Sequence, residues 1–365
     1  MNNKTQKLTI FFFCGWILML SIGLVVVQAR DFSPQENRYL SQFPSFSMDA
    51  LFSGDYTTKV EEYVIDQFPQ RDLFVQFKAG LIFAAGQLEN KGVYFGKEGY
   101  LIPKFLVVDE EEIQNNIQKM IQFQAEYTDI NFSWMIVPTV ATVAQDSLPD
   151  AAVNIDQIKI LDSIEQKVTQ WVSLSSLNQS DYFYKTDHHW NTAGAQVAYQ
   201  AYMNSISVES KIFSTELVSD NFKGTSSSLS GAYWYSEDSI YKIEQDQIQS
   251  TVTFEDGTQY ASLYFPNWLS QKDQYSYYLD GNHALTYIEN VGVQEDLGTL
   301  LILKDSFAHS LVPYLSAHYS HIILLDLRYY NSDVSTFLVD HKVDRILYLY
   351  GLDTLSDEKN FVFLK

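Results

Sequence analysis

The stretch of residues 8–29 constrains this chain more than any other feature, because it is largely apolar and contains no charged residue. At about 1.5 Å per residue, a helix of this length spans a hydrocarbon core of roughly 30 Å. Lys4 and Lys7 precede it, and positive charge is typical of the cytoplasmic side of a membrane helix. We therefore predict a cytoplasmic tail over residues 1–7, a single transmembrane signal anchor over residues 8–29, and an exported chain from Arg30 onward.

A cleaved signal peptide is the alternative interpretation of the same stretch. Val27, Gln28 and Ala29 end it with small residues at the positions that a signal peptidase requires, so cleavage would follow Ala29. The apolar run is longer than the core of roughly 7–15 residues that a cleaved signal usually has, which favours the anchor. Both interpretations export the rest of the chain.

Composition restricts the function of the exported part. The chain has 365 residues, 46% of them hydrophobic, which is enough for one large domain or two ordinary ones with a real core. The net charge of -21 repels phosphate backbones and argues against nucleic-acid binding. The one cysteine, Cys14, lies inside the apolar stretch, so the exported part has neither a disulfide nor a thiol nucleophile.

Two regions with different patterns follow the apolar stretch. We interpret residues 30–90 as an irregular, partly helical lead-in, with helical spacing over residues 56–68 that Pro69 ends. Residues 91–365 alternate between continuous apolar strands and amphipathic helices, which is typical of an α/β fold with a parallel sheet covered on both faces. An irregular β-rich insertion over about residues 213–295 interrupts this rhythm. The predicted elements are a hairpin at 93–102, strands at 132–137, 299–303, 321–327 and 345–350, and helices at 110–127, 156–172, 307–317 and 334–341.

The first candidate for chemistry is the run Asp187-His188-His189-Trp190, just before a predicted helix over residues 193–204 that Asn191 or Thr192 caps. Residues two apart point the same way in an extended segment, so Asp187 could orient His189 as a general base. A capped loop whose histidines fill hydrogen bonds is the simpler interpretation. A metal site from Asp187, His188 and His189 is the third, but the sequence offers no second dense cluster to complete it, and we predict no metal.

The second candidate is Ser306, which follows the predicted strand 299–303 and begins a helix. Ligands of open α/β sheets bind at the carboxyl ends of strands, and a helix N-terminus favours an oxyanion. An ordinary helix cap at Asp305 and Ser306 is the alternative. His309 would share the helix face of Ser306 and is a second candidate base. We prefer His189, because a carboxylate lies beside it in the sequence.

Two further segments could complete a site around the serine. Gly281 and Asn282 could supply oxyanion donors, although the sequence alone favours a plain turn. Arg328 could bind an anionic or hydroxyl-rich substrate and Tyr329 could stack on it, while an ion pair between Asp326 and Arg328 is the structural alternative.

At these residues the chain resembles the DHHW protein family, and it is similar to the alginate O-acetyltransferase proteins of bacterial exopolysaccharide systems. The Asp187-His188-His189-Trp190 motif with the downstream Asp305-Ser306-Phe307 carries most of the resemblance. Shorter matching stretches run in order from about residue 36 to 330: Glu36-Asn37-Arg38, Asp66-Gln67-Phe68-Pro69-Gln70-Arg71-Asp72, Glu89-Asn90-Lys91-Gly92-Val93-Tyr94, Phe222-Lys223-Gly224-Thr225, Gly281-Asn282-His283 and Asp326-Leu327-Arg328-Tyr329.

The resemblance implies a three-layer SGNH-hydrolase-like fold whose segments are circularly permuted, because the serine comes first in ordinary SGNH enzymes and last here. It implies Ser306 as nucleophile, His189 as base and Asp187 as the third member, with His188 beside them. It also implies a partner, a membrane-bound O-acyltransferase that passes an acetyl group outward, so that this chain binds no cofactor of its own. Lys304 departs from the pattern, since SGNH proteins usually have glycine there.

Three functions follow from these expectations. The leading one is an extracytoplasmic O-acetyltransferase that acts on a cell-surface or exported polysaccharide. The second is an esterase that removes acetyl groups from the same kind of glycan, since only the acceptor differs. The third is a carbohydrate-binding or assembly module with an inactive site, which Lys304 keeps open.

Overall fold

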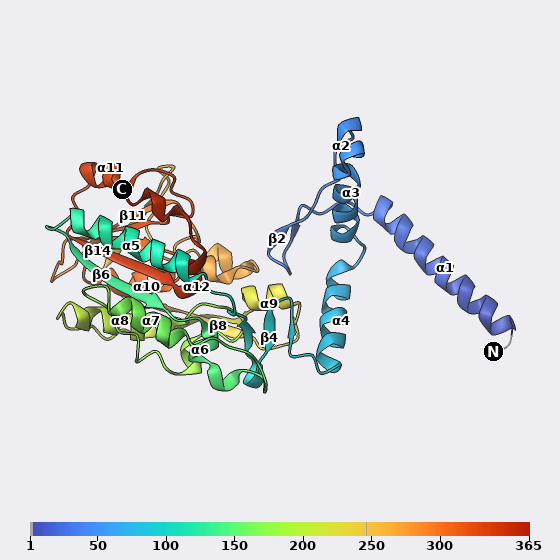
Figure 1. Cartoon of the computed structure of the whole chain (residues 1–365), viewed down its shortest axis with the longest axis horizontal. Coiled ribbons are helices and arrows are strands. Elements are labelled where there is room, and N and C mark those ends of the chain that lie inside the picture. The colour runs from blue at the N-terminus through green and yellow to red at the C-terminus, as the bar shows by residue number, and fades with distance from the viewer. Residues whose placement is uncertain (1–2, 246) are drawn as a thin grey trace. The chain divides into compact units, whose positions relative to one another are not determined.

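A computed structural model describes residues 3–245 and 247–365 of the chain (Figure 1). The chain divides into two compact units. The first contains Met1–Gln87 together with Gly231–Tyr233, and the second contains Leu88–Ser230 and Trp234–Lys365.

The first unit begins with the apolar helix α1 (Asn3–Val26). An 18-residue window within Lys4–Val26 has a mean hydropathy of 2.4, and by length and composition this is the one described helix that could cross a membrane. The helix ends three residues before the predicted limit at Ala29. The other elements of this unit are β1 (Phe32–Ser33), β2 (Arg38–Tyr39), α2 (Met48–Ser53), α3 (Asp55–Asp66) and α4 (Arg71–Ala84). The sequence pattern predicted α3 but missed α4.

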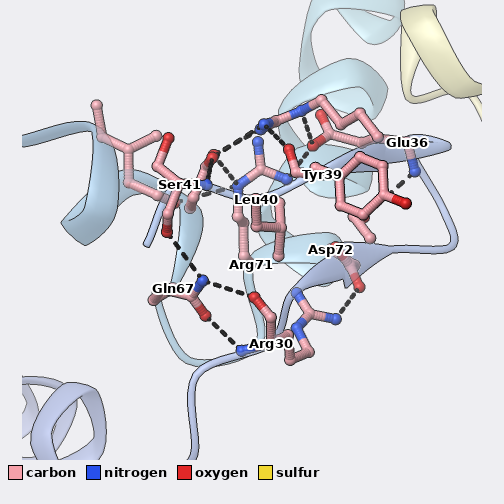
Figure 2. Close-up of polar contacts among 12 residues, drawn as sticks. Arg30, Glu36, Tyr39, Leu40, Ser41, Gln67, Arg71 and Asp72 are labelled. Atoms are coloured by element: carbon pink, nitrogen blue, oxygen red, sulfur yellow. Dashed lines mark hydrogen bonds and ion pairs between the residues drawn. The ribbon is translucent and has the colours of Figure 1, made fainter. Parts of the chain in front are cut away.

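Ion pairs, rather than buried apolar side chains, hold the lead-in together. Leu40, Ala79 and Ala232 are the buried hydrophobic residues among the described part of this unit. The carboxylate of Asp66 accepts hydrogen bonds from Arg38 at 2.5 and 2.9 Å, and Arg71 pairs with Glu36 beside it (Figure 2). The hydrogen bond from Arg38 is the main reason why the pKa of Asp66 falls to about 2. The lead-in is therefore a folded element rather than a loose linker.

A seven-stranded mixed sheet forms the centre of the second unit (Figure 1). The strand order is β10-β9-β11-β13-β12-β14-β6. The last four strands in that order pair in parallel, and the others pair antiparallel. The strands are β6 (Asn131–Val137), β9 (Gln249–Phe254), β10 (Gln259–Tyr260), β11 (Leu285–Val291), β12 (Thr299–Lys304), β13 (His321–Leu325) and β14 (Arg345–Gly351).

Helices cover both faces of the parallel strands, because those strands bury side chains on both sides. Alternate residues of β12 enter different cores: Leu300 and Ile302 pack with α8 (Thr192–Ser205) and α10 (Ala308–Leu315). Leu301 and Leu303 pack in the opposite core, which also contains residues of α5 (Glu110–Glu126), α7 (Gln157–Glu165), α11 (Val334–Asp340) and α12 (Leu352–Asp357). The predicted α/β architecture with three layers is confirmed.

Outside the central sheet, β3 (Glu89–Asn90), β4 (Val93–Phe95) and β5 (Leu101–Pro103) form an antiparallel sheet that contains the predicted hairpin. The strands β7 (Thr215–Phe222) and β8 (Asp238–Ile243) form a two-stranded antiparallel ribbon, and α9 (Thr225–Ser230) lies in the connection between them.

Two sequence predictions require correction. The helix predicted over residues 156–172 ends at Glu165, because Gln170 adopts a positive φ and Trp171 forms a parallel bridge with Trp134 of β6. The region interpreted as an insertion is also part of the main sheet, since β9 and β11 extend it antiparallel. Their burial alternates along the strand, as expected for strands with one solvated face.

Candidate active site

Ser306 lies between the end of β12 and the start of α10, where its side chain is partly exposed. The preceding carboxylate fixes this turn: Asp305 accepts hydrogen bonds from the backbone N–H of Phe307 at 3.0 Å and of Gly351 at 2.6 Å. Gly351 ends the neighbouring strand β14, so the turn is attached to the sheet on both sides. The backbone N–H of Ser306 donates to no acceptor in the described part of the chain, and it remains available to a ligand.

His189 joins the serine to a carboxylate. Its ring Nε2 lies 2.6 Å from Ser306 Oγ, and its ring Nδ1 lies 2.5 Å from Asp187 Oδ1. The bridge between Phe183 and Trp190 and the capping of α8 by the Asn191 side chain hold this segment in place. The structure thus brings Ser306 to a histidine that is 117 residues away in the chain and to the carboxylate beside that histidine.

The carboxylate determines which nitrogen of the imidazole carries the proton. Asp187 is buried and ionised, so it accepts from His189 Nδ1, which leaves Nε2 free to accept the serine proton. Burial raises the pKa of Asp187, but the two neighbouring imidazoles and the hydrogen bonds to the carboxylate outweigh it, and the net pKa is lowered. Burial lowers the pKa of His189, and the neighbouring His188 lowers it further. Asp187 raises it, but the two lowering effects are larger, and the resulting pKa is about 4. A neutral imidazole at neutral pH suits a general base.

Thr225, which no local sequence pattern singled out, supports the carboxylate from its other side. The backbone N–H and the hydroxyl of Thr225 donate to Asp187 Oδ2 at 2.7 and 2.9 Å. Gly224 allows this close approach: a Cβ atom there would lie 2.6 Å from Asp187 Cγ. The Gly224-Thr225 pair appeared in the sequence only as part of the family resemblance.

A second missed residue covers the imidazole. The ring of Tyr275 is stacked on that of His189, with centroids 4.0 Å apart and planes 9° apart. Its hydroxyl donates to the carbonyl oxygen of Ser306 at 3.0 Å. On α10, Ser310 accepts a hydrogen bond from the indole of Trp190 at 3.0 Å, which ties the Asp-His-His-Trp segment to the helix of the nucleophile. Tyr275 lies in a tyrosine-rich stretch that gave no signal in the sequence.

His188 lies beside the hydrogen-bonded chain rather than within it. Its Nδ1 lies 2.8 Å from Thr225 Oγ1, and its ring is packed on that of His189. One ligand atom each from Asp187, His188 and His189 lies within 4.8 Å of the others, as a metal would require. Both ring nitrogens of His189 already have partners, however, so a metal would have to displace one of them.

The residues predicted to bind substrate are held in a separate polar cluster. Arg328 bonds to Asp326 through Nε at 2.8 Å and a terminal nitrogen at 2.6 Å, as in the ion pair that was considered as the alternative. The same guanidinium donates to Asn282 Oδ1 at 3.2 Å, and the amide NH₂ of this exposed residue has no partner among the described residues. Gly281 has a φ of +80°, and Tyr329 is half exposed under Arg328. In the described part of the chain none of these four residues hydrogen-bonds to Ser306.

The side chains of Lys304 and His309 contact each other in a buried polar cluster. Lys304 Nζ lies 2.8 Å from His309 Nε2 and 3.1 Å from Asp326 Oδ2, and both its side chain and that of His309 are buried. His309 therefore contacts the lysine and not the serine hydroxyl, so the structure favours His189 over it as a base. The lysine that replaces glycine in the pattern is directed into this buried cluster.

Known proteins share this fold. Residues 93–259 match the family described as the SGNH hydrolase-like domain, acetyltransferase AlgX, and the match includes Asp187 and His189. A DHHW family protein from Eubacterium siraeum is similar, with a TM-score of 0.64 and 20% identity over 76% of this chain and 95% of that one. PatB1 from Bacillus cereus, solved with a sulfonyl adduct, has a TM-score of 0.61 and 22% identity over 75% and 100%.

A comparison with curated proteins gives no match. The second unit is an SGNH-hydrolase-like domain of mixed α/β type. Within that class, the chain carries a domain that matches the AlgX family and has a DHHW family protein among its structural neighbours.

Proposed function

We propose that this chain is an extracytoplasmic O-acetyltransferase that moves an acetyl group through Ser306 onto hydroxyls of a cell-surface or exported polysaccharide. The observation that carries the proposal is the continuous hydrogen-bonded chain from Ser306 Oγ through His189 to Asp187. The description of the matching family as an acetyltransferase supports the same reaction class.

In the first half-reaction, His189 Nε2 takes the proton of Ser306 as Oγ attacks the carbonyl carbon of the acetyl donor. The free backbone N–H of Ser306 stabilises the oxyanion, and the free amide of Asn282 is the candidate second donor. The donor's leaving group departs with the proton from His189, and the acetyl group remains on Ser306 as an ester.

In the second half-reaction, His189 takes the proton of an acceptor hydroxyl, which attacks the ester. Collapse of the tetrahedral intermediate transfers the acetyl group to the acceptor and returns the proton to Ser306. Asp187 keeps its charge throughout and stabilises the imidazolium that forms in each step. A sugar hydroxyl as acceptor gives a transferase, and water gives an esterase.

The proposal places the site outside the cytoplasm, with α1 as an uncleaved single-pass anchor whose N-terminus is inside. The length and apolar character of α1 support this topology. The acetyl group then has to cross the membrane before it reaches Ser306. We propose that a membrane-bound O-acyltransferase delivers it, and that the chain binds no cofactor of its own.

The proposal can be tested with the full chain in lipid nanodiscs, an aryl acetyl ester as donor and candidate oligosaccharides as acceptors. The expected result is acetylated oligosaccharide by mass spectrometry, abolished by Ser306→Ala. Ser316→Ala is the matched control, since the hydroxyl of this buried serine of the same region donates to the backbone of α10 and to nothing else within residues 3–245 and 247–365. Free acetate without acetylated sugar would identify an esterase. Sugar binding without turnover would identify a binding module.

A further inference from the structure

Helix α4 has one exposed apolar face. Leu73, Phe74, Phe77 and Leu81 recur at the spacing of one helix face, and they are 58%, 37%, 62% and 55% exposed. On the opposite side Val75 and Ala79 pack inward, since a Cβ atom on Gly231 would lie 2.8 Å from Val75 Cγ1 and 3.7 Å from Ala79 Cβ, while Phe83 near the C-terminal end is 47% exposed. Four large apolar side chains on one short helix form a surface that water does not favour.

The end of α1 is fastened to the start of α4. Gln67 accepts a hydrogen bond from the backbone N–H of Arg30 at 2.9 Å and donates one to its carbonyl oxygen at 2.8 Å. The guanidinium of Arg30 bonds to Asp72, in the first turn of α4, at 2.9 Å (Figure 2). Arg30 lies only four residues beyond Val26, so no free linker separates the apolar helix from the lead-in.

The two helices also touch directly. A Cβ atom on Gly23 would lie 2.9 Å from Pro69 Cγ, and the rings of Trp16 and Phe74 have centroids 6.5 Å apart. Trp16 lies ten residues before Val26 (26 minus 16), which is about 15 Å along a helix and about half of a 30 Å hydrocarbon core. If α1 spans a membrane, the ring of Phe74, which contacts Trp16, lies below the surface of that membrane.

We propose that α4 lies in the outer boundary of the bilayer that contains α1, with Leu73, Phe74, Phe77 and Leu81 in lipid. Its 14 residues are too few to span the bilayer, and the partly exposed Asp72 and the exposed Lys78 keep the rest of the helix near water. The lead-in is then a second membrane contact that holds the start of the exported chain against the surface. This inference depends on α1 as a membrane helix and is independent of the proposed chemistry.

The test uses the full chain reconstituted in vesicles of phosphatidylcholine, some of it carrying a doxyl quencher on the acyl chain. In a Cys14→Ser background, which has no other cysteine, Phe77→Cys and Leu81→Cys each carry an environment-sensitive fluorophore. Gln76→Cys, next to Phe77 but on another side of α4, is the matched control. Val339→Cys on α11, where the side chain is 84% exposed, reports a water-facing position.

We expect doxyl lipid to quench the labels at 77 and 81 several-fold more than those at 76 and 339. Equal quenching at all four positions would overturn the proposal. Labels at 77 and 81 that are shielded from iodide in water but insensitive to doxyl lipid would also overturn it, since protein would then cover the helix. Both replaced side chains are more than half exposed, so these variants remove few packing contacts.

Discussion

Gly224→Ala is the substitution whose effect follows most directly from the site geometry. Gly224 is buried beside the carboxylate, and an added methyl group would lie 2.6 Å from Asp187 Cγ. Carbon atoms in contact are separated by about 3.5 Å or more, so the carboxylate or the Gly224 backbone has to move by about 1 Å. The φ angle of Gly224 is not in the left-handed region, and the crowding is therefore the whole perturbation.

A displacement of 1 Å in a catalytic group costs about 10²-fold in rate, or roughly 2.7 kcal/mol. We therefore expect kcat/KM for an aryl acetyl ester to fall about 10²-fold in Gly224→Ala. Overpacking is expected to lower the free energy of unfolding by about 1–3 kcal/mol, which thermal unfolding of the full chain in detergent would report.

A double-mutant cycle with Asp187→Gly separates crowding of the Asp187 side chain from a general disturbance. The glycine at 187 removes Cβ, Cγ and Oδ2, the three atoms that the new methyl group would strike, so Gly224→Ala should have little further effect on kcat/KM in that background. An equal fold-loss in both backgrounds, or no loss in the single variant, would refute the reasoning.

Three further predictions concern the same site. The base has to be neutral to accept the serine proton, and burial above all lowers the pKa of His189 to about 4. We therefore expect kcat/KM to be constant near neutral pH and to fall as the pH drops through about 4. A midpoint near 6.5 would contradict this. Thr225→Val removes the hydroxyl that donates to Asp187 but leaves the backbone N–H, so we expect kcat/KM to fall about 3–10-fold. Thr225→Ser keeps a hydroxyl and should restore the rate, and equal rates in the valine and serine variants would contradict this. Trp190→Phe loses the hydrogen bond to Ser310 and part of a buried ring, which should lower the free energy of unfolding by about 1–3 kcal/mol, and an unchanged melting temperature would show that neither matters.

The strands and helices of the parallel part could be predicted because their signals are local. Continuous apolar runs such as that of β12 are buried on both faces, and the spacing in α5 matches one turn of a helix. The predictions failed where a distant partner determines the structure. The chain after Glu165 leaves its helix to pair with β6, and β9 and β11 join the sheet through partners far along the chain.

The residues of the candidate site were also predictable where their signal is local and not where it depends on distant partners. The motif residues Asp187 and His189 and the serine after a buried strand were visible in the sequence, because each carries a recognisable local pattern. Thr225 and Tyr275 were not, since a threonine at a helix start and one tyrosine among 25 become informative only when folding places them against the carboxylate and the imidazole. The ion pair of Arg328 with Asp326 was one of the two interpretations that the sequence left open, whereas its hydrogen bond to Asn282, 46 residues away, depends on the folded chain.

The central claim is that Ser306 is the nucleophile and that His189 activates it. Its most direct test is intact-mass analysis of the full chain after brief incubation with an aryl acetyl ester, beside Ser306→Ala and His189→Ala. We predict a single acetyl adduct on Ser306 in the wild-type chain and none in either variant. An adduct that persists in Ser306→Ala, or a wild-type chain that neither forms an adduct nor turns over the ester, would contradict it.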